Sequence, residues 1–230
     1  MSDGSPLTND DPRAYLAEAR RRALAHGETL PDRVSGSGLF ADISGFTPVT
    51  EALALSLGAR RGAEELVANL NRILEALIDD LHGFGGEVIY FSGDAITCWI
   101  DGDDGTLAAA CGLAMQNTMQ RVGHVEIDRD TTIVLSLKVA VAVGPARRFV
   151  VGDPELQLIE VLAGSLIDDL AAAEGVAEPG DVILEPSAIE SIGAAATLAE
   201  HRKQDGLVYG VLTSLSDAPE PEVLTVGFDD

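Results

Sequence analysis

A single acid stands inside an otherwise apolar run at residues 39–43, and Gly45-Phe46-Thr47-Pro48 follows that run. The run is typical of a buried strand, and Gly45 permits a tight turn after it. Thr47 suits a helix N-cap, and Pro48 suits the first helical position. Because a buried carboxylate must be paired or hold a metal, Asp42 is expected to meet a cation where this strand ends.

A second acid, Asp94, occupies the tip of a predicted hairpin. Apolar β-type runs flank Ser92-Gly93-Asp94 on both sides, as in a tight two-stranded turn. If this hairpin pairs with residues 39–43, Asp94 lies beside Asp42, and the two carboxylates repel each other unless cations lie between them. The backbone N–H groups of residues 43–47 are expected to form an anion site at a helix start. Together the two stretches predict a site for divalent cations and a polyphosphate.

The composition narrows the class of partner. The chain has 230 residues, of which 46% are hydrophobic, so it can form one large domain with extensions. Its net charge of −23 argues against non-specific binding to nucleic acid or an anionic membrane, and it favours cations at any polyphosphate site. No apolar run is long enough to insert in a membrane, no signal-peptide pattern is present, and Cys98 and Cys111 lie in apolar surroundings. Reduced core thiols in a cytoplasmic protein are therefore expected.

The periodicity predicts both helices and strands. Helices are expected over residues 11–27, 48–57, 62–82, 107–122, 165–174 and 186–192, and strands, besides the hairpin, over 39–43, 133–143, 148–151, 157–162, 181–184 and 207–212. A break is expected at Gly144-Pro145, and the basic runs 20–22 and 147–148 are interpreted as solvated rather than phosphate-binding. This order predicts an α+β, ferredoxin-like (split βαβ) sandwich with a mostly antiparallel sheet covered by helices.

The same residues resemble a known family. The stretches Phe40-Ala41-Asp42-Ile43-Ser44-Gly45-Phe46-Thr47 and Phe91-Ser92-Gly93-Asp94-Ala95 are similar to the paired metal-site motifs of class III nucleotidyl cyclases. Residues 61–66, Gly85-Gly86 and Gly152-Asp153 resemble more closely the first catalytic domain of soluble adenylyl cyclases and their bacterial relatives. The resemblance covers residues 36–213, the expected cyclase homology domain. An N-terminal helix and linker (1–35) and an acidic flexible tail (214–230) are expected to flank it.

The resemblance implies an adenylate cyclase, a lyase of cAMP biosynthesis in signal transduction. ATP would bind with two Mg²⁺ or Mn²⁺ ions, which Asp42 and Asp94 hold together with the carbonyl of Ile43. The ribose 3′-hydroxyl would attack the α-phosphorus, and pyrophosphate would leave by two-metal catalysis. The resemblance assigns the phosphate contacts to the backbone N–H groups of Ser44, Gly45, Phe46 and Thr47.

The chain departs from the family on the complementary face, which a second domain presents. The positions of a base-recognising Lys, a base-recognising Asp or Thr, and a transition-state Asn and Arg hold Tyr90, Val161, Asp168 and Ala172. One positioned donor contributes typically about 100-fold in rate, so a homodimer is expected to be a poor cyclase. The positions that bind bicarbonate in soluble cyclases hold Tyr90 and Ala171, so bicarbonate sensing is not expected.

Two functions stay open. In the first, the chain is the metal-binding half of an adenylyl cyclase, and it needs a complementary cyclase domain in a homodimer or heterodimer. In the alternative, it is a catalytically degenerate pseudo-cyclase that binds a nucleotide or a partner and regulates signalling. The substrate or ligand is ATP or another nucleoside triphosphate, since the base-recognising positions differ from the family. A cyclic-dinucleotide synthase is disfavoured, because the hairpin lacks the Gly-Gly-Asp/Glu-Glu-Phe sequence of those enzymes.

Overall fold

The computed structural model describes residues 16–222. Its helices are α1 Glu18–His26, α2 Phe46–Leu57, α3 Ala59–Gly83, α4 Thr106–Val122, α5 Ser165–Val176 and α6 Pro186–Ile192, with a short 3₁₀ turn at Gly193–Ala195. Its strands are β1 Arg33–Ser44, β2 Glu87–Ser92, β3 Ala95–Asp101, β4 His124–Glu126, β5 Thr132–Val134, β6 Ser136–Asp153, β7 Gln157–Ala163, β8 Val182–Leu184, β9 Ala196–Gln204 and β10 Leu207–Leu215.

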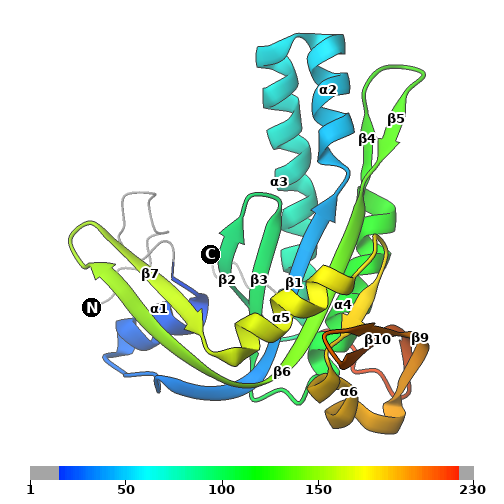
Figure 1. The fold of residues 1–230 in the computed structure, drawn as a ribbon. Coiled ribbons are helices and arrows are strands. Elements are labelled where there is room, and N and C mark those ends of the chain that lie inside the picture. The colour runs from blue at the N-terminus through cyan, green and yellow to red at the C-terminus, as the bar shows by residue number, and fades with distance from the viewer. Residues whose placement is uncertain (1–15, 223–230) are drawn as a thin grey trace.

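One sheet forms the centre of the molecule (Figure 1). Its strand order is β2-β3-β1-β6-β8-β10-β9, and β7 pairs with β6 outside this path. β6 and β8 run parallel, whereas the other pairs are antiparallel, as predicted. A separate two-stranded sheet of β4 and β5 projects from the same end of the main sheet as α2 and α3 (Figure 1). The predicted α+β sandwich is confirmed.

β1 lies in the middle of the sheet, and its side chains alternate between two cores. Leu39 and Ile43 pack in the core that α3 and α4 cover, whereas Phe40 packs in the core beneath α5. Figure 1 shows α5 crossing in front of β1 and β6, with α3 and α4 behind them. Asp42 lies two residues after Phe40, so it projects from the α5 side of the sheet.

The predicted break at Gly144 and Pro145 is wrong, because β6 continues through both residues. Pro145 is opposite Ser35 of β1, while on the other side of β6 the partner β8 covers only residues 139–141 and β7 begins to pair at Arg147. Between these two partners β6 has a neighbour on one side only, a place where a strand tolerates the missing N–H of proline. β4 and β9 were not predicted, and the strand predicted over 133–143 is divided at Leu135 into β5 and the start of β6.

Two arginines that were interpreted as solvated are instead buried in an ion cluster that anchors α1. Arg20 of α1 is 6% exposed and Arg148 of β6 is 4% exposed, and both donate to Oε1 of Glu160 on β7. Glu87 of β2 accepts from the backbone N–H of Ala19 at 3.0 Å and lies 3.8 Å from Arg148. These four side chains, Arg20, Arg148, Glu160 and Glu87, are called the Glu160 cluster below.

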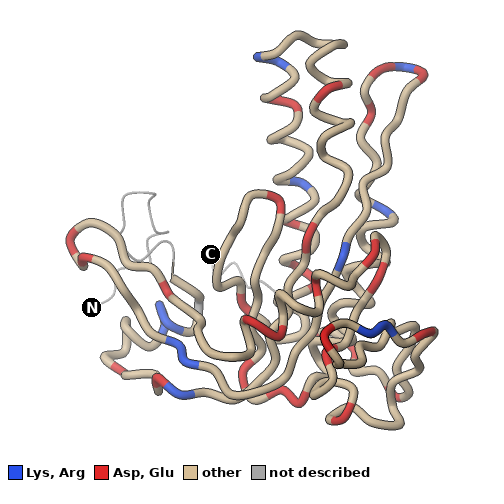
Figure 2. Tube along the Cα trace, in the orientation of Figure 1, with Lys and Arg blue, Asp and Glu red and all other residues tan. Residues whose placement is uncertain are grey.

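Acidic residues occur throughout the described part of the chain, and basic residues lie around α1 and the adjoining base of the sheet as well as on α3 and at the β4–β5 tip (Figure 2). No described helix is both long enough and apolar enough to span a bilayer. Cys98 and Cys111 are buried free thiols, as predicted.

β1 begins at Arg33 and β10 ends at Leu215, so both strands extend past the proposed domain limits of 36 and 213. Residues 11–15 of the predicted first helix and residues 223–230 of the proposed tail lie outside the described part of the chain.

Candidate metal and nucleotide site

The site begins where β1 ends and α2 starts. Gly45 is the N-cap of α2 with a φ of 103°, a conformation that only glycine adopts readily, so the helix starts directly at Phe46. The predicted cap at Thr47 is therefore wrong, and the Thr47 side chain is exposed without a capping bond. Pro48 still lies within the first turn, where its missing N–H is not needed by the helix. The free backbone donors of this turn precede Pro48.

The predicted hairpin is confirmed, and it brings Asp94 to the end of β1. Ser92 pairs with Ala95, so Gly93 and Asp94 form a two-residue turn between β2 and β3. Ala95 in turn is opposite Asp42 in the β1–β3 ladder, and the backbone N–H of Ile43 donates to the carbonyl of Asp94 at 3.4 Å. The two aspartates, 52 positions apart in sequence, are thus neighbours in space.

A lysine and a glutamate that sequence reasoning missed complete the charged group. Lys138 of β6 is opposite Asp42 in the β1–β6 ladder, and its Nζ lies 3.3 Å from Oδ2 of Asp42. The same ammonium makes a closer ion pair with Oε1 of Glu174, which lies near the C-terminal end of α5. The side chains of Asp42, Lys138 and Glu174 are 24%, 19% and 29% exposed, so all three are mostly withdrawn from water.

Burial and neighbouring charges shift the pKa values of this group. Burial raises the pKa of Asp42, and the carboxylates of Asp94 and Glu174 raise it further, while Lys138 opposes them. Burial lowers the pKa of Lys138, but the hydrogen bonds and charges of Glu174 and Asp42 outweigh it, so the pKa of Lys138 is raised. The ammonium therefore stays charged, and the carboxylates of Asp42 and Glu174 share its one positive charge.

This donor set suits a hard divalent cation. Mg²⁺ and Mn²⁺ prefer oxygen ligands, and Asp42, Asp94 and the carbonyl of Ile43 offer oxygens at one corner of the fold. The surplus of negative charge around Asp42 would be neutralised by a bound cation. Among the described residues no three His, Cys, Asp or Glu side chains gather where they could hold a metal ion, so a cation here would have two carboxylates as its protein side-chain ligands. Remaining ligands would come from water or from a bound phosphate.

The four positions at which the sequence departs from the class III cyclase pattern lie on β2, β7 and α5. Tyr90 is on β2 and is 58% exposed, and Val161 is a partly buried residue of β7. Asp168 lies in the first turn of α5, exposed, and Ala172 lies one turn later. None of the four carries a positive charge as Lys or Arg would, or an amide as Asn would.

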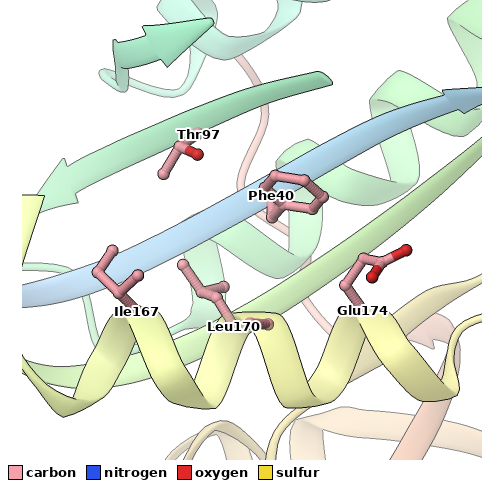
Figure 3. Close-up of a pocket in the computed structure, with 6 residues that line it drawn as sticks. Phe40, Thr97, Ile167, Leu170 and Glu174 are labelled. Carbon is pink, nitrogen blue, oxygen red and sulfur yellow. The ribbon is translucent and has the colours of Figure 1, made fainter. Parts of the chain in front are cut away.

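A pocket of about 160 Å³ adjoins the charged group on the α5 side. Figure 3 shows Ile167, Leu170 and Glu174 along α5, facing Phe40 of β1 and Thr97 of β3, and Ala171 completes the wall. The lining is apolar apart from Thr97 and Glu174, so an anion in this pocket would meet a carboxylate and no basic side chain. Glu174 thus lies between the pocket and Lys138.

Lys138 had a signal in the sequence, because it is a lone charge inside the apolar residues 135–143, as Asp42 is inside residues 39–43. Glu160 carries the same signal inside β7. Glu174 has none, since acids are common on helices and nothing in its spacing points to the sheet.

No family model matches the chain. Among curated proteins, adenylate cyclase type 10 of Mus musculus and of Homo sapiens are each 29% identical to it over 170 residues. The matched region is 71% of this chain and 10% of each relative, so the chain spans about a tenth of the length of the curated relatives it matches.

Solved structures of cyclases share the fold. The guanylyl cyclase Cya2 superposes with a TM-score of 0.70 at 21% identity, covering 83% of this chain and 98% of that one. The adenylyl cyclase CyaB from P. aeruginosa superposes with a TM-score of 0.64 at 20% identity, covering 80% of this chain and 97% of that one. The guanylate cyclase domain of RhGC from Catenaria anguillulae in complex with GTP has a TM-score of 0.66 at 16% identity, covering 81% of this chain and 100% of that one. These likenesses show a common fold.

Proposed function

We propose that this chain, a class III nucleotidyl cyclase catalytic domain in its fold and its sequence motifs, is the metal-binding half of an adenylyl cyclase. The observation that supports it most is the meeting of Asp42 and Asp94 beside the first turn of α2. Two acids placed together at a strand end and a hairpin tip repel each other, and partial burial removes water that would weaken the repulsion. Lys138 pairs with Asp42 but is shared with Glu174, so a divalent cation held by both aspartates would lower this cost.

The chain's own residues would divide the work at this corner. Asp42 and Asp94 would hold the cations, and the N–H groups at the start of α2 would face the phosphates. The ammonium of Lys138 adds positive charge at the same edge. Bound divalent cations would supply Lewis-acid stabilisation of the phosphoryl oxygens and would lower the pKa of the attacking hydroxyl. In the proposed reaction the ribose 3′-hydroxyl displaces pyrophosphate from the α-phosphorus, which yields cyclic AMP.

A complementary domain is required by this proposal. The groups that would recognise the base and stabilise the transition state are replaced by Tyr90, Val161, Asp168 and Ala172, and the exposed carboxylate of Asp168 would repel a phosphate. ATP is proposed as substrate because the sequence relatives are named adenylate cyclases, although the structural neighbours include guanylyl cyclases. The flanking divisions 1–35 and 214–230 are proposed as extensions of the 36–213 cyclase homology domain.

The same substitutions support a second candidate, a pseudo-cyclase that binds a metal–nucleotide and passes on a signal without turnover. The presence of an acid at Asp168, rather than a neutral residue, favours this candidate, since it opposes catalysis in any homodimer.

The test is cyclic nucleotide formation from ATP and from GTP with Mn²⁺, with the chain alone and mixed with cyclase domains that carry the missing Lys, Asn and Arg. We expect little activity alone and cAMP formation in a complementary pair, which Asp42→Ala or Asp94→Ala abolishes. Binding of Mn²⁺–ATP without turnover in every pairing would favour the pseudo-cyclase. Absence of both binding and turnover would overturn both candidates.

A further inference from the structure

Lys138 stands between two carboxylates that come from different elements. The β1–β6 register alone places its ammonium beside Asp42, since the two residues are opposite each other. Glu174 reaches the same ammonium from α5, across the face of the sheet, and makes the closer of the two contacts. Figure 3 shows Glu174 at the end of the α5 row that faces Phe40.

This arrangement matters to any cation that binds Asp42. A metal ion and the Lys138 ammonium carry the same sign, so an ammonium 3.3 Å from Oδ2 of Asp42 competes with a metal for that carboxylate. In this structure the ammonium contacts both acids, so Asp42 shares it with Glu174, whereas without Glu174 its remaining contact would be Asp42. Glu174 supplies the other acid, and it is 29% exposed, so water weakens the pair only in part.

We propose that Glu174 is a positioning residue that holds Lys138 and thereby leaves the carboxylate of Asp42 available to a divalent cation. This inference rests on the proposed function, because it assumes that Asp42 binds metal. Through Glu174, α5 would help to prepare the metal site. The proposal also explains why an acid at the end of this helix points back toward the sheet.

A simpler explanation must be separated from the proposed one. Glu174 carries a negative charge near the site, so removing it weakens cation binding through space whether or not Lys138 is present. A positioning role, in contrast, requires the lysine. A double-mutant cycle over Glu174→Gln and Lys138→Met distinguishes the two, because only the positioning role makes the effect of one substitution depend on the other.

The first measurement is the affinity for Mn²⁺ alone, by electron paramagnetic resonance of free Mn²⁺, in the four proteins of the cycle. We expect Glu174→Gln to weaken binding about tenfold when Lys138 is present and less than about threefold in the Lys138→Met background, the difference being a coupling between contacting residues. The matched control is Glu178→Gln, which removes an acid that is 76% exposed, pairs with Arg202 and lies just beyond α5. It should change the affinity less than about twofold, as expected for an exposed charge.

The second measurement follows the lysine itself. The sequence contains two lysines, Lys138 and Lys203, and Lys203 is exposed, so lysine-labelled protein gives one signal to follow and one internal reference. In the metal-free protein the Nζ signal of Lys138 should be protected from exchange with water, and Glu174→Gln should remove that protection while Lys203 stays unchanged. A circular dichroism melt of each variant checks that the fold is kept.

The outcomes are distinguishable. Equal weakening in both lysine backgrounds, or no change in Glu174→Gln, overturns the positioning role while the proposed function stands. If the wild-type chain binds no Mn²⁺, the proposed function fails, and protection of the Lys138 signal then reports only a structural ion pair, which also overturns the inference.

Discussion

The charge balance around Asp42 decides how the metal-free domain behaves. Asp94 and Glu174 both act on Asp42, and one ammonium, that of Lys138, pairs with Asp42 and Glu174, so the corner carries surplus negative charge in partly buried surroundings. A cation that binds there relieves repulsion in the folded state only, because the unfolded chain does not bring the two aspartates together. Metal binding is therefore linked to folding stability.

Divalent cations should raise the melting temperature. At a Mn²⁺ concentration about 100 times the Kd, linkage contributes about 2.7 kcal/mol. For a domain of this size that corresponds to a rise of roughly 5–10 °C. Differential scanning calorimetry with Mn²⁺ and after chelation measures it, and Asp94→Asn should lose most of the rise. A rise of equal size in Asp94→Asn would place the bound ion elsewhere.

Asp80 predicts a pH dependence that is independent of metal. Burial raises the pKa of Asp80 on α3, a hydrogen bond with Thr118 and the charge of Arg121 oppose the shift, and its Oδ2 has no hydrogen-bond partner within the described residues. The pKa of Asp80 is higher in the folded state than in the unfolded state. The fold therefore loses stability as the pH rises above the unfolded-state pKa, where the unfolded chain releases the proton first. Asp80→Asn should therefore gain stability over wild type between about pH 4 and pH 7. Paired melts at the two pH values check the sign, and a gain that shrinks with rising pH contradicts it.

Single charges in apolar strands were the most informative residues. The sequence predicted the corner because Asp42 is such an acid and Asp94 lies at the tip of a hairpin that could pair with the same strand. The same argument applied to Lys138 and Glu160 would have predicted a buried cation and a buried ion cluster. Glu174 could not be predicted, because its role depends on how α5 crosses the sheet.

At the scale of elements, α1 is fastened to the sheet by the Glu160 cluster. Glu160 is 1% exposed and sits between Arg20 and Arg148, so its loss leaves two buried guanidinium groups short of an acid. Glu160→Gln should cost about 3–5 kcal/mol of unfolding free energy. The matched change Glu64→Gln ends an exposed pair with Arg60 on α3 and should cost less than about 0.5 kcal/mol. Urea unfolding compares them, and similar costs for both would show that the cluster contributes little.

The close packing of α5 on β1 depends on Gly38. A Cβ at this position would lie 2.6 Å from Cδ1 of Leu170 and 2.8 Å from Cδ2 of Leu166, so these leucine side chains, or α5 with them, would have to shift. Gly38→Ala should cost about 1–3 kcal/mol by overpacking. Gly144→Ala on the next strand is the control, because its Cβ would meet Leu166 at an ordinary 3.9 Å. Chemical unfolding of both variants measures the difference in the free energy of unfolding. An unchanged free energy in Gly38→Ala would mean that the packing between α5 and β1 adjusts at little cost.

Elements with strong periodicity were predicted within a few residues. α3 and α4 have long apolar stripes, and α6 begins with Pro186 as its sequence indicates. The start of α2 was misplaced because Gly45 in the left-handed conformation, rather than Thr47, is the N-cap of the helix. β9 was missed because most of its residues are exposed, and edge strands of this kind lack an apolar pattern.

At the scale of the whole molecule, the net charge is −23, and in the proposed function the chain supplies one half of a site. Two copies would repel each other, and each would face the other with Asp168 in place of a neutral or basic group. A partner that supplies cationic side chains answers both the missing chemistry and the excess charge. The fold class was predicted from the order of elements, whereas the proposed need for a partner rests on single positions and not on the fold.

The central claim is that Asp42 and Asp94 jointly hold divalent cations against a nucleotide. A crystal of this chain soaked with Mn²⁺ and a non-hydrolysable ATP analogue, examined by the anomalous signal of manganese, tests it most directly. The account predicts a manganese peak within about 2.0–2.4 Å of carboxylate oxygens of both residues, with the analogue's phosphates at the start of α2. A nucleotide-bound crystal with no manganese between these two aspartates would contradict it.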